Sequence, residues 1–257
     1  MKVIVFLSLL AAGLSVAACA NTSTILRADF DPAFEIVAGA DLPELPSGDQ
    51  LTTSDCDRGA AAITGAQFLI GGRCIVEFTS RPFERGESDQ DALYLISGQT
   101  FPAEGGTGAI IYFTGETRAD DFLVGNDELW WMLWLRDGSY WFAPGPTMLR
   151  ALNRAQERGE DLADIEFGSA GFRAEYPINE TFTAIVRYEL ENPSGGFSRR
   201  RLYVNFEFAT ARGTQTWRQR VRARPIGLGN NATVILQSIG DGPALFVDLL
   251  QVQAISR

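Results

Sequence analysis

Two segments late in the chain alternate apolar and polar residues with a period of two, and this pattern constrains the fold more than any other feature. One side of residues 182–190 carries Phe182, Ala184, Val186, Tyr188 and Leu190, and one side of residues 202–208 carries Leu202, Val204, Phe206 and Phe208. Successive side chains of a strand point to opposite faces, so each segment has one apolar face and one polar face. This is typical of antiparallel strands that cover a core on one side and meet water on the other.

Further segments rich in β-branched and aromatic residues are separated by Gly, Pro, Asn and Asp. Together with the first two, they are Ala61–Glu77, Ala92–Ile96, Gly108–Thr114, Leu129–Leu135, Tyr140–Phe142, Thr181–Leu190, Arg201–Thr210, Thr216–Ala223, Ala232–Ile239 and Ala244–Ile255. No strand–helix–strand rhythm and no linker interrupts them. The sequence therefore predicts an all-β chain whose residues 27–257 form a single antiparallel, jelly-roll-type β-sandwich domain.

One segment has helical spacing instead. Residues 147–158 follow Pro144-Gly145-Pro146 and end before Gly159. Thr147 is a suitable N-cap and Gly159 a suitable C-terminal stop. The apolar side chains of this segment share one face, so we expect one short amphipathic helix packed over the sandwich.

The N-terminus has the three parts of a secretory signal in residues 1–18: a cation, an apolar run and small residues. Val16-Ala17-Ala18-Cys19 resembles the lipobox of bacterial lipoproteins, in which the cysteine is acylated. The resemblance implies a lipid on Cys19, a tether over residues 19–26 and a place in the bacterial envelope. Ala20 stands where an aspartate would resemble an inner-membrane retention signal, so we expect the outer membrane. Ordinary cleavage after Ala20 is the alternative.

Composition excludes several kinds of site. The chain has no His, which rules out Ser-His-Asp and Cys-His nucleophiles and the commonest zinc and copper ligand. A net charge of −10 disfavours nucleic acid as a partner. We therefore expect no catalytic residue, no metal site and no cofactor. Apart from Cys19, only Cys56 and Cys74 remain, and in an oxidising compartment they predict one disulfide, with metal binding by the two thiols as the alternative.

Asp137-Gly138 predicts a two-residue hairpin turn, and such a turn sets the register of the strands on either side. Counting from it pairs Arg136 with Ser139, and then Leu135 with Tyr140, Trp134 with Trp141, and Leu133 with Phe142. One side then holds Leu129, Trp131, Leu133, Leu135, Tyr140 and Phe142, and the other holds Trp130, Met132, Trp134, Arg136, Ser139 and Trp141.

The first of these sides should be core, and two interpretations of the second are open. If it is exposed, Trp130, Trp134 and Trp141 with Arg136 form an aromatic platform for sugar rings. If the nearby helix covers it, the same tryptophans form a second layer of core.

Arginines alternate along residues 217–224, which places Arg218, Arg220, Arg222 and Arg224 on one side of a strand. Guanidinium groups pair with carboxylate, phosphate or sulfate. The candidate partners are an acidic polysaccharide, lipid phosphates, or acids of this chain across neighbouring strands.

Two pairs of acids, Asp29/Asp31 and Glu189/Glu191, are spaced to share a strand face. Glycosidases use two carboxyl groups flanking the scissile bond, whereas paired acids on strands also serve as salt-bridge partners. We expect the second role.

Both ends of the domain resemble known sandwiches. Arg27-Ala28-Asp29-Phe30-Asp31 resembles the first strand of concanavalin A-like and laminin G-like domains. Residues 244–252, ALFVDLLQV, resemble the closing strand of carbohydrate-binding jelly rolls. The resemblance implies glycan binding, in some members with structural calcium, and the E-x-D-x-x-E strand of one lectin-like hydrolase family is absent.

We therefore expect a lipid-anchored domain that binds an oligosaccharide or polysaccharide and does not catalyse. A structural or interaction lipoprotein with no small ligand is the alternative, and a glycan-cleaving enzyme is the third.

Overall fold

A computed structural model describes residues 21–28, 34–37, 50–56, 60–64, 67–71, 74–101, 108–114, 130–136, 138–160, 171–176, 179–191, 201–221, 231–239 and 243–256. For residues 34–37, 50–56 and 60–64 it describes the backbone alone. The signal segment and Cys19 lie outside these ranges. Within the part described, no helix is both long and apolar enough to cross a bilayer.

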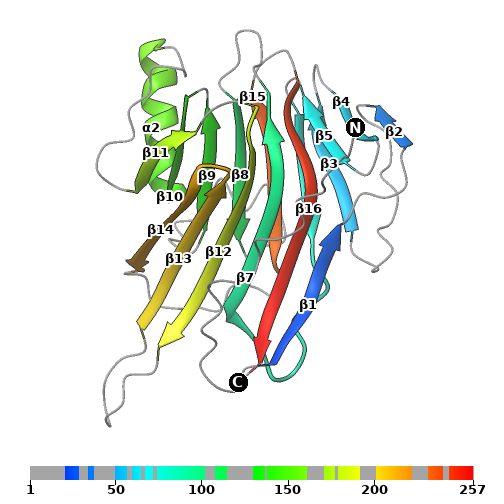
Figure 1. The fold of residues 1–257 in the computed structure, drawn as a ribbon, viewed down its shortest axis with the longest axis vertical. Coiled ribbons are helices and arrows are strands. Elements are labelled where there is room, and N and C mark those ends of the chain that lie inside the picture. The colour runs from blue at the N-terminus through cyan, green and yellow to red at the C-terminus, as the bar shows by residue number, and fades with distance from the viewer. Residues whose placement is uncertain are drawn as a thin grey trace, which may run out of the picture.

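Two antiparallel sheets form the fold, one behind the other in Figure 1. The first, nine-stranded sheet contains β1 (Asn21–Ala28), β2 (Phe34–Val37), β4 (Ala60–Thr64), β5 (Gln67–Gly71), β7 (Glu87–Thr100), β12 (Thr181–Glu191), β13 (Arg201–Thr210), β14 (Gly213–Arg220) and β16 (Pro243–Ser256). The second, seven-stranded sheet contains β3 (Gln50–Cys56), β6 (Cys74–Thr79), β8 (Gly108–Thr114), β9 (Trp131–Arg136), β10 (Gly138–Pro144), β11 (Phe172–Tyr176) and β15 (Thr233–Ile239). One helix, α2 (Gly145–Arg158), packs behind the second sheet. The predicted all-β sandwich with one short helix is confirmed.

The strand orders place sequence neighbours and distant segments side by side. The nine-stranded sheet runs β14-β13-β12-β7-β16-β5-β4-β2, with β1 paired to β16, and the seven-stranded sheet runs β11-β10-β9-β8-β15-β6-β3. Every pairing between these strands is antiparallel. Among the described strands, β14 and β11 therefore stand at the ends of their sheets.

The alternating segments form the core as predicted. Phe182, Ala184, Val186 and Tyr188 of β12 and Leu202, Val204, Phe206 and Phe208 of β13 are buried in the main core. Apolar side chains of β8, β9 and β10 meet them from the second sheet. The aromatic rings interlock: Phe142 stacks on Phe206 with ring centroids 3.9 Å apart, and Tyr140 stacks on Phe208 at 4.0 Å. Aromatic contacts of this kind add to the stabilisation that burial provides.

Helix α2 begins earlier than predicted. It starts at Gly145, whose backbone N–H donates to the carbonyl oxygen of Trp130 at 3.0 Å, so the predicted N-cap at Thr147 is wrong. Its end is as predicted: Gly159 has φ +64°, and the Glu160 N–H donates to the Ala155 carbonyl at 2.9 Å. This bond closes the last turn in the manner of a glycine C-cap.

Other predicted boundaries also change. Strand β1 begins at Asn21 and pairs with β16, so residues 21–26 belong to the sheet and the tether predicted over 19–26 is wrong for them. The long run 61–77 is three strands, β4, β5 and β6. Strands β2, β3 and β11 were not predicted. Each lies at an end of its sheet, where a clear apolar face is not required.

The register supports the predicted disulfide without testing it. Cys56 of β3 lies directly opposite Cys74 of β6, which is buried. Opposite residues of an antiparallel pair have Cα atoms about 4.5–5.5 Å apart, a separation that a disulfide spans. The side chain of Cys56 lies outside the described residues, so the bond stays a prediction.

Candidate functional site at the open edge of the sandwich

The predicted register of the 137–138 hairpin is confirmed. Arg136 pairs with Ser139, and the next three pairs follow as counted, while Gly138 has φ +72° as the turn requires. The side predicted as core is core at every described position: Trp131, Leu133, Leu135, Tyr140 and Phe142 belong to the main cluster. Leu129 lies outside the described residues.

The aromatic platform on the other side is not a binding surface. Trp130, Trp134 and Trp141 are only 1 %, 0 % and 7 % exposed, so the prediction of accessible indoles is wrong and the core interpretation is confirmed. No sugar ring can stack on them in this structure.

Helix α2 is the physical reason. Its apolar face packs on this side of the hairpin and closes a second hydrophobic cluster, separate from the main core. The cluster contains Ile110, Tyr112, Trp130, Met132, Trp134, Trp141, Ala143, Met148, Ala155 and Ile235. Arg136 and Arg173 lie over the rings of Trp134 and Trp141 at 5.2 and 4.5 Å, which covers the indoles further.

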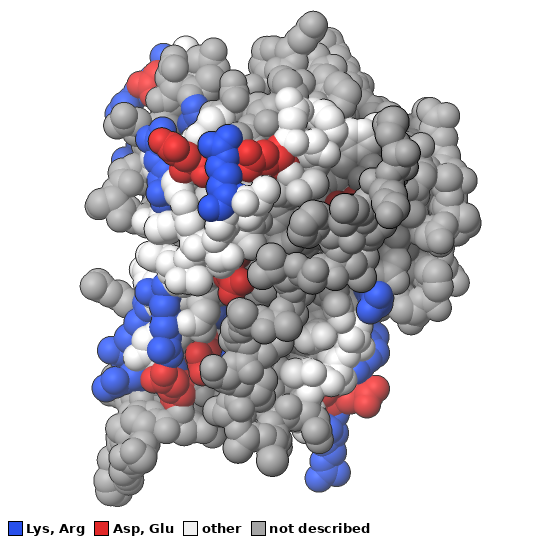
Figure 2. All heavy atoms as spheres, viewed as in Figure 1, with Lys and Arg blue, Asp and Glu red and all other residues white. Residues whose placement is uncertain are grey.

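The predicted arginine stripe is engaged within the protein at Arg218. Arg218 pairs with Glu191 and with Glu189, the latter at 3.6 Å, and its guanidinium lies 4.2 Å from the ring of Tyr203. Figure 2 shows basic and acidic side chains next to one another at the lower left of this face. Pairing across strands is therefore confirmed for Arg218, and the acid pair Glu189/Glu191 acts as its salt-bridge partner.

The other arginines of the stripe remain predictions. Arg220 is exposed, whereas Arg222 and Arg224 lie outside the described residues, as does the acid pair Asp29/Asp31.

A cleft of about 400 Å³ opens where β14 and β11 stand at the ends of the two sheets. Its walls come from β10, β11 and β13, from the turn between β13 and β14, and from β14 itself. The lining residues are Tyr140, Glu175, Phe208, Thr210, Arg212, Gly213, Thr214 and Gln215. The turn needs glycine at 213, where φ is +138°. The cleft therefore has a polar rim, and the buried residues Tyr140 and Phe208 close its base.

Tyr140 and Gln215 connect the two sheets across the cleft. The Tyr140 hydroxyl donates to the Gln215 side-chain oxygen at 2.5 Å. Burial raises the pKa of Tyr140, so this phenol stays neutral and keeps its proton for the hydrogen bond. The amide nitrogen of Gln215, an exposed residue, adds two donors at the rim.

The turn carries the charged part of the rim. The Arg212 Nε–H donates to a Glu180 carboxylate oxygen at 2.8 Å, and the Arg212 side chain is still 66 % exposed. Glu175 on β11 is also exposed. An arginine, a carboxylate, an amide and two threonine hydroxyls thus surround one opening, and each of these groups can donate or accept hydrogen bonds.

Trp217 stands beside the cleft on the same side of β14 as Gln215. It is half-buried, and its ring meets Trp131 at 5.4 Å and Phe142 at 5.9 Å, both edge-on. The other four tryptophans of the chain are buried. Trp217 is therefore the tryptophan whose surroundings, and hence whose emission, a ligand at this edge would change most.

The described part of the chain holds no group of three or more Cys, Asp or Glu side chains arranged to bind a metal ion. Glu175 is the one carboxylate among the described residues that line the cleft.

Sequence reasoning did not find this cleft. Tyr140 and Gln215 are 75 positions apart, and no local pattern links them. The available signal was the polar turn 211–213 between two alternating segments. It predicts a hairpin, but it does not predict which strand of the other sheet lies opposite that hairpin.

No protein-family model and no curated protein sequence matches the chain. Among solved structures, an endo-1,3-beta-glucanase from Streptomyces sioyaensis superposes with a TM-score of 0.53 at 12 % identity, covering 94 % of this chain and 99 % of its own. Lectin II from Ulex europaeus gives 0.45 at 8 % identity, covering 88 % and 99 %. The VIP36 exoplasmic/lumenal domain in its Ca2+/Man3GlcNAc-bound form gives 0.44 at 8 % identity, covering 85 % and 86 %. The glucanase match shows the fold alone, an antiparallel two-sheet sandwich that resembles concanavalin A-like jelly rolls.

Proposed function

We propose that this protein is a lipid-anchored, non-catalytic carbohydrate-binding domain of the bacterial envelope, and that its glycan site is the cleft between β14 and β11. The observation that carries the proposal is the composition of that cleft. It gathers hydrogen-bonding groups from Gln215, Thr210 and Thr214 around one opening, whose base is closed by the buried residues Tyr140 and Phe208. A few convergent polar groups in a cleft fix a small ligand in one orientation.

Binding fits this cleft better than cleavage does. Glycoside hydrolysis by the usual route needs two carboxyl groups on either side of one bond. Among its described lining residues the cleft presents only Glu175, and Glu180 is engaged by Arg212. The fold shared with a glucanase does not decide between the two activities, because one fold can host unrelated functions.

A glycan array probed with the mature protein tests the ligand class. For a glycan that binds, Trp217 fluorescence then gives the affinity of Gln215→Ala against that of Gln219→Ala. Both glutamines are exposed and on the same side of β14, but only Gln215 lines the cleft. Loss of one hydrogen bond predicts binding about 2- to 10-fold weaker for Gln215→Ala, with no change for Gln219→Ala.

Two results would reject the glycan site. One is an array with no bound glycan, which would favour the interaction lipoprotein without a small ligand. The other is an equal affinity for the two glutamine variants.

The lipid anchor has its own test. Cys19→Ala should move the protein from the detergent phase to the aqueous phase, because it removes the acylation site. Wild-type protein that is already aqueous, with Asn21 at its N-terminus, would show that ordinary cleavage occurs instead.

A further inference from the structure

Strand β1 begins at one end of the nine-stranded sheet. Asn21 lies opposite Ser256 of β16, and Ser256 lies opposite Glu87, the first residue of β7. These residues therefore share the lower end of the sheet in Figure 1, where β1 starts beside the C-terminal label.

The cleft lies toward the opposite end of the same sheet. Strand β7 runs from Glu87 to Thr100, Gln99 pairs with Thr181 of β12, and the next residue of β12, Phe182, pairs with Thr210. The turn that carries Arg212 follows at once. Thirteen steps along β7 at about 3.3 Å each separate the two ends by about 40 Å.

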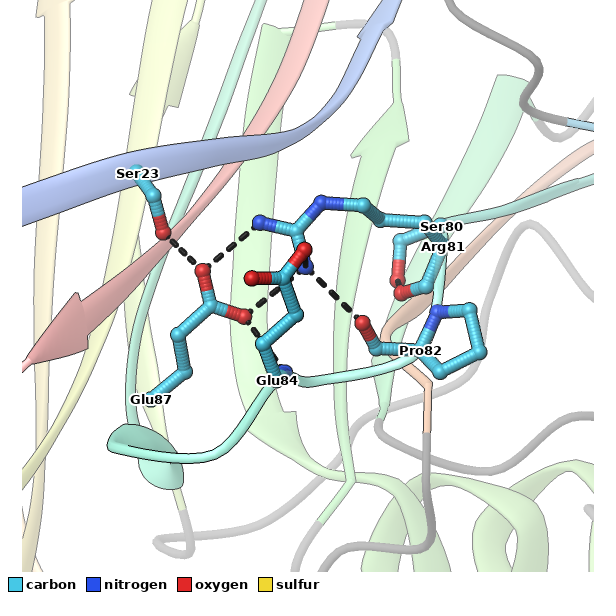
Figure 3. Close-up of polar contacts among 6 residues, drawn as sticks. All are labelled: Ser23, Ser80, Arg81, Pro82, Glu84 and Glu87. Atoms are coloured by element: carbon cyan, nitrogen blue, oxygen red, sulfur yellow. Dashed lines mark hydrogen bonds and ion pairs between the residues drawn. The ribbon is translucent and has the colours of Figure 1, made fainter.

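The beginning of β1 is fixed to the body of the domain. Figure 3 shows the Ser23 hydroxyl and the Arg81 guanidinium both meeting the Glu87 carboxylate. The two Arg81 bonds measure 2.9 and 2.6 Å, and the Glu84 N–H donates to the same carboxylate at 2.8 Å. The Arg81 backbone N–H also donates to the Ile25 carbonyl at 3.1 Å. These hydrogen bonds hold the beginning of β1 against the sandwich.

We infer that the domain stands upright on the membrane, with the end formed by Asn21, Ser256 and the turn 81–86 against the lipid headgroups and the cleft about 40 Å away. This inference rests on the lipid proposed for Cys19. Only one residue, Ala20, lies between Cys19 and Asn21, so two Cα–Cα steps of at most about 7 Å in total join them. A lipid so close to a fixed strand holds this end of the sandwich at the bilayer surface.

The partner of this surface is a phospholipid headgroup layer. Pro82, Glu84, Arg85 and Gly86 are exposed there, and of these side chains the Arg85 guanidinium is the one that can pair with headgroup phosphate. Arg81 is held by Glu87, so Arg85 is the cation of this turn that faces outward. A cleft held away from the bilayer is then open to long glycans.

The test uses the lipidated full-length protein in phosphatidylcholine vesicles that contain headgroup-nitroxide lipids. Arg85→Cys and Ala211→Cys are each labelled with one thiol-reactive fluorophore, at exposed turns at the two ends. Wild-type protein treated with the same fluorophore shows how much label reacts with the native cysteines. We expect the label at position 85 to lose most of its fluorescence and the label at 211 to keep nearly all of it.

Flotation of the vesicles separates the two proposals. Protein that floats while both labels stay bright, or while position 211 is quenched more than position 85, overturns the orientation and leaves the anchor in place. Protein that does not float overturns the anchor and the orientation that depends on it.

Discussion

The carboxylate of Glu87 should stabilise the fold in a strongly pH-dependent way. Its side chain is 7 % exposed, and it accepts hydrogen bonds from Arg81, from the Glu84 N–H and from Ser23. The hydrogen bonds from Arg81 are the largest cause that lowers its pKa, from 4.5 to about 2, against the opposing effect of burial. The ionised form is thus favoured by the folded state.

The size of the effect follows from the two pKa values. A lowering from 4.5 to about 2 corresponds to about 3 kcal/mol of differential interaction. Arg81 is 31 % exposed, and solvent screening weakens such a pair, so we expect about 1.5–3 kcal/mol at pH 7. Because the folded pKa is the lower one, this stability is complete above pH 4.5 and is lost as the pH falls toward 2.

Urea unfolding of Glu87→Gln measures this contribution. The variant should lose about 1.5–3 kcal/mol at pH 7, and by linkage about 40 % of that loss should remain at pH 3. Glu160→Gln is the matched control, because its pair with Arg158 is 48 % and 65 % exposed and should contribute at most about 0.5 kcal/mol. A loss for Glu87→Gln no larger than the control, or one that is equal at pH 7 and pH 3, would refute the reasoning.

Three further substitutions test the packing. Trp134→Ala should cost about 3–5 kcal/mol in urea unfolding because the indole is fully buried, and a cost under 1 kcal/mol would mean that the helix does not cover it. Gly145→Ala should cost about 1–3 kcal/mol, because its Cβ would overlap the ring of Trp130, and an unchanged melting temperature would place the start of the helix elsewhere. Cys56→Ser should cost on the order of 3 kcal/mol if it opens a disulfide to Cys74, and two alkylatable thiols in the unreduced wild type would contradict that bond.

The register of the 137–138 hairpin could be predicted from the sequence. Asp137-Gly138 favours a two-residue type I′ turn, and with it every pair from 136/139 to 133/142 could be counted correctly. The turn type sets the register of the two strands, and the register sets the face on which each side chain lies. Both steps depend only on local backbone geometry.

Local backbone geometry does not determine which face of the hairpin is exposed to water. The face with Trp134 is closed by a helix that follows it in the chain, and only tertiary packing determines where that helix lies. One sequence signal could have decided the matter: Met148 and Ala155 form an apolar helix face that needs a partner surface, and the tryptophan face was the unassigned one.

The cleft and the hydrogen bonds that fix the start of β1 could not be predicted from the sequence. Tyr140 meets Gln215 across 75 positions and Ser23 meets Glu87 across 64. Such contacts depend on the strand order of two whole sheets, which period-two alternation does not specify. The cleft was therefore found from the structure alone.

The seven-stranded sheet is packed on both faces around its hairpin, against the other sheet on one side and α2 on the other. Strands β9 and β10 consequently have almost no position at which a polar substitution would be neutral. Strands β12 and β13 alternate buried with more exposed positions, and β14 is exposed at every position except Trp217, so these strands accept change at many more residues. As descendants of this chain accumulate mutations, the sequence of the hairpin should change most slowly. A new binding specificity is most easily acquired on β12, β13 and β14 and on the turns that join them.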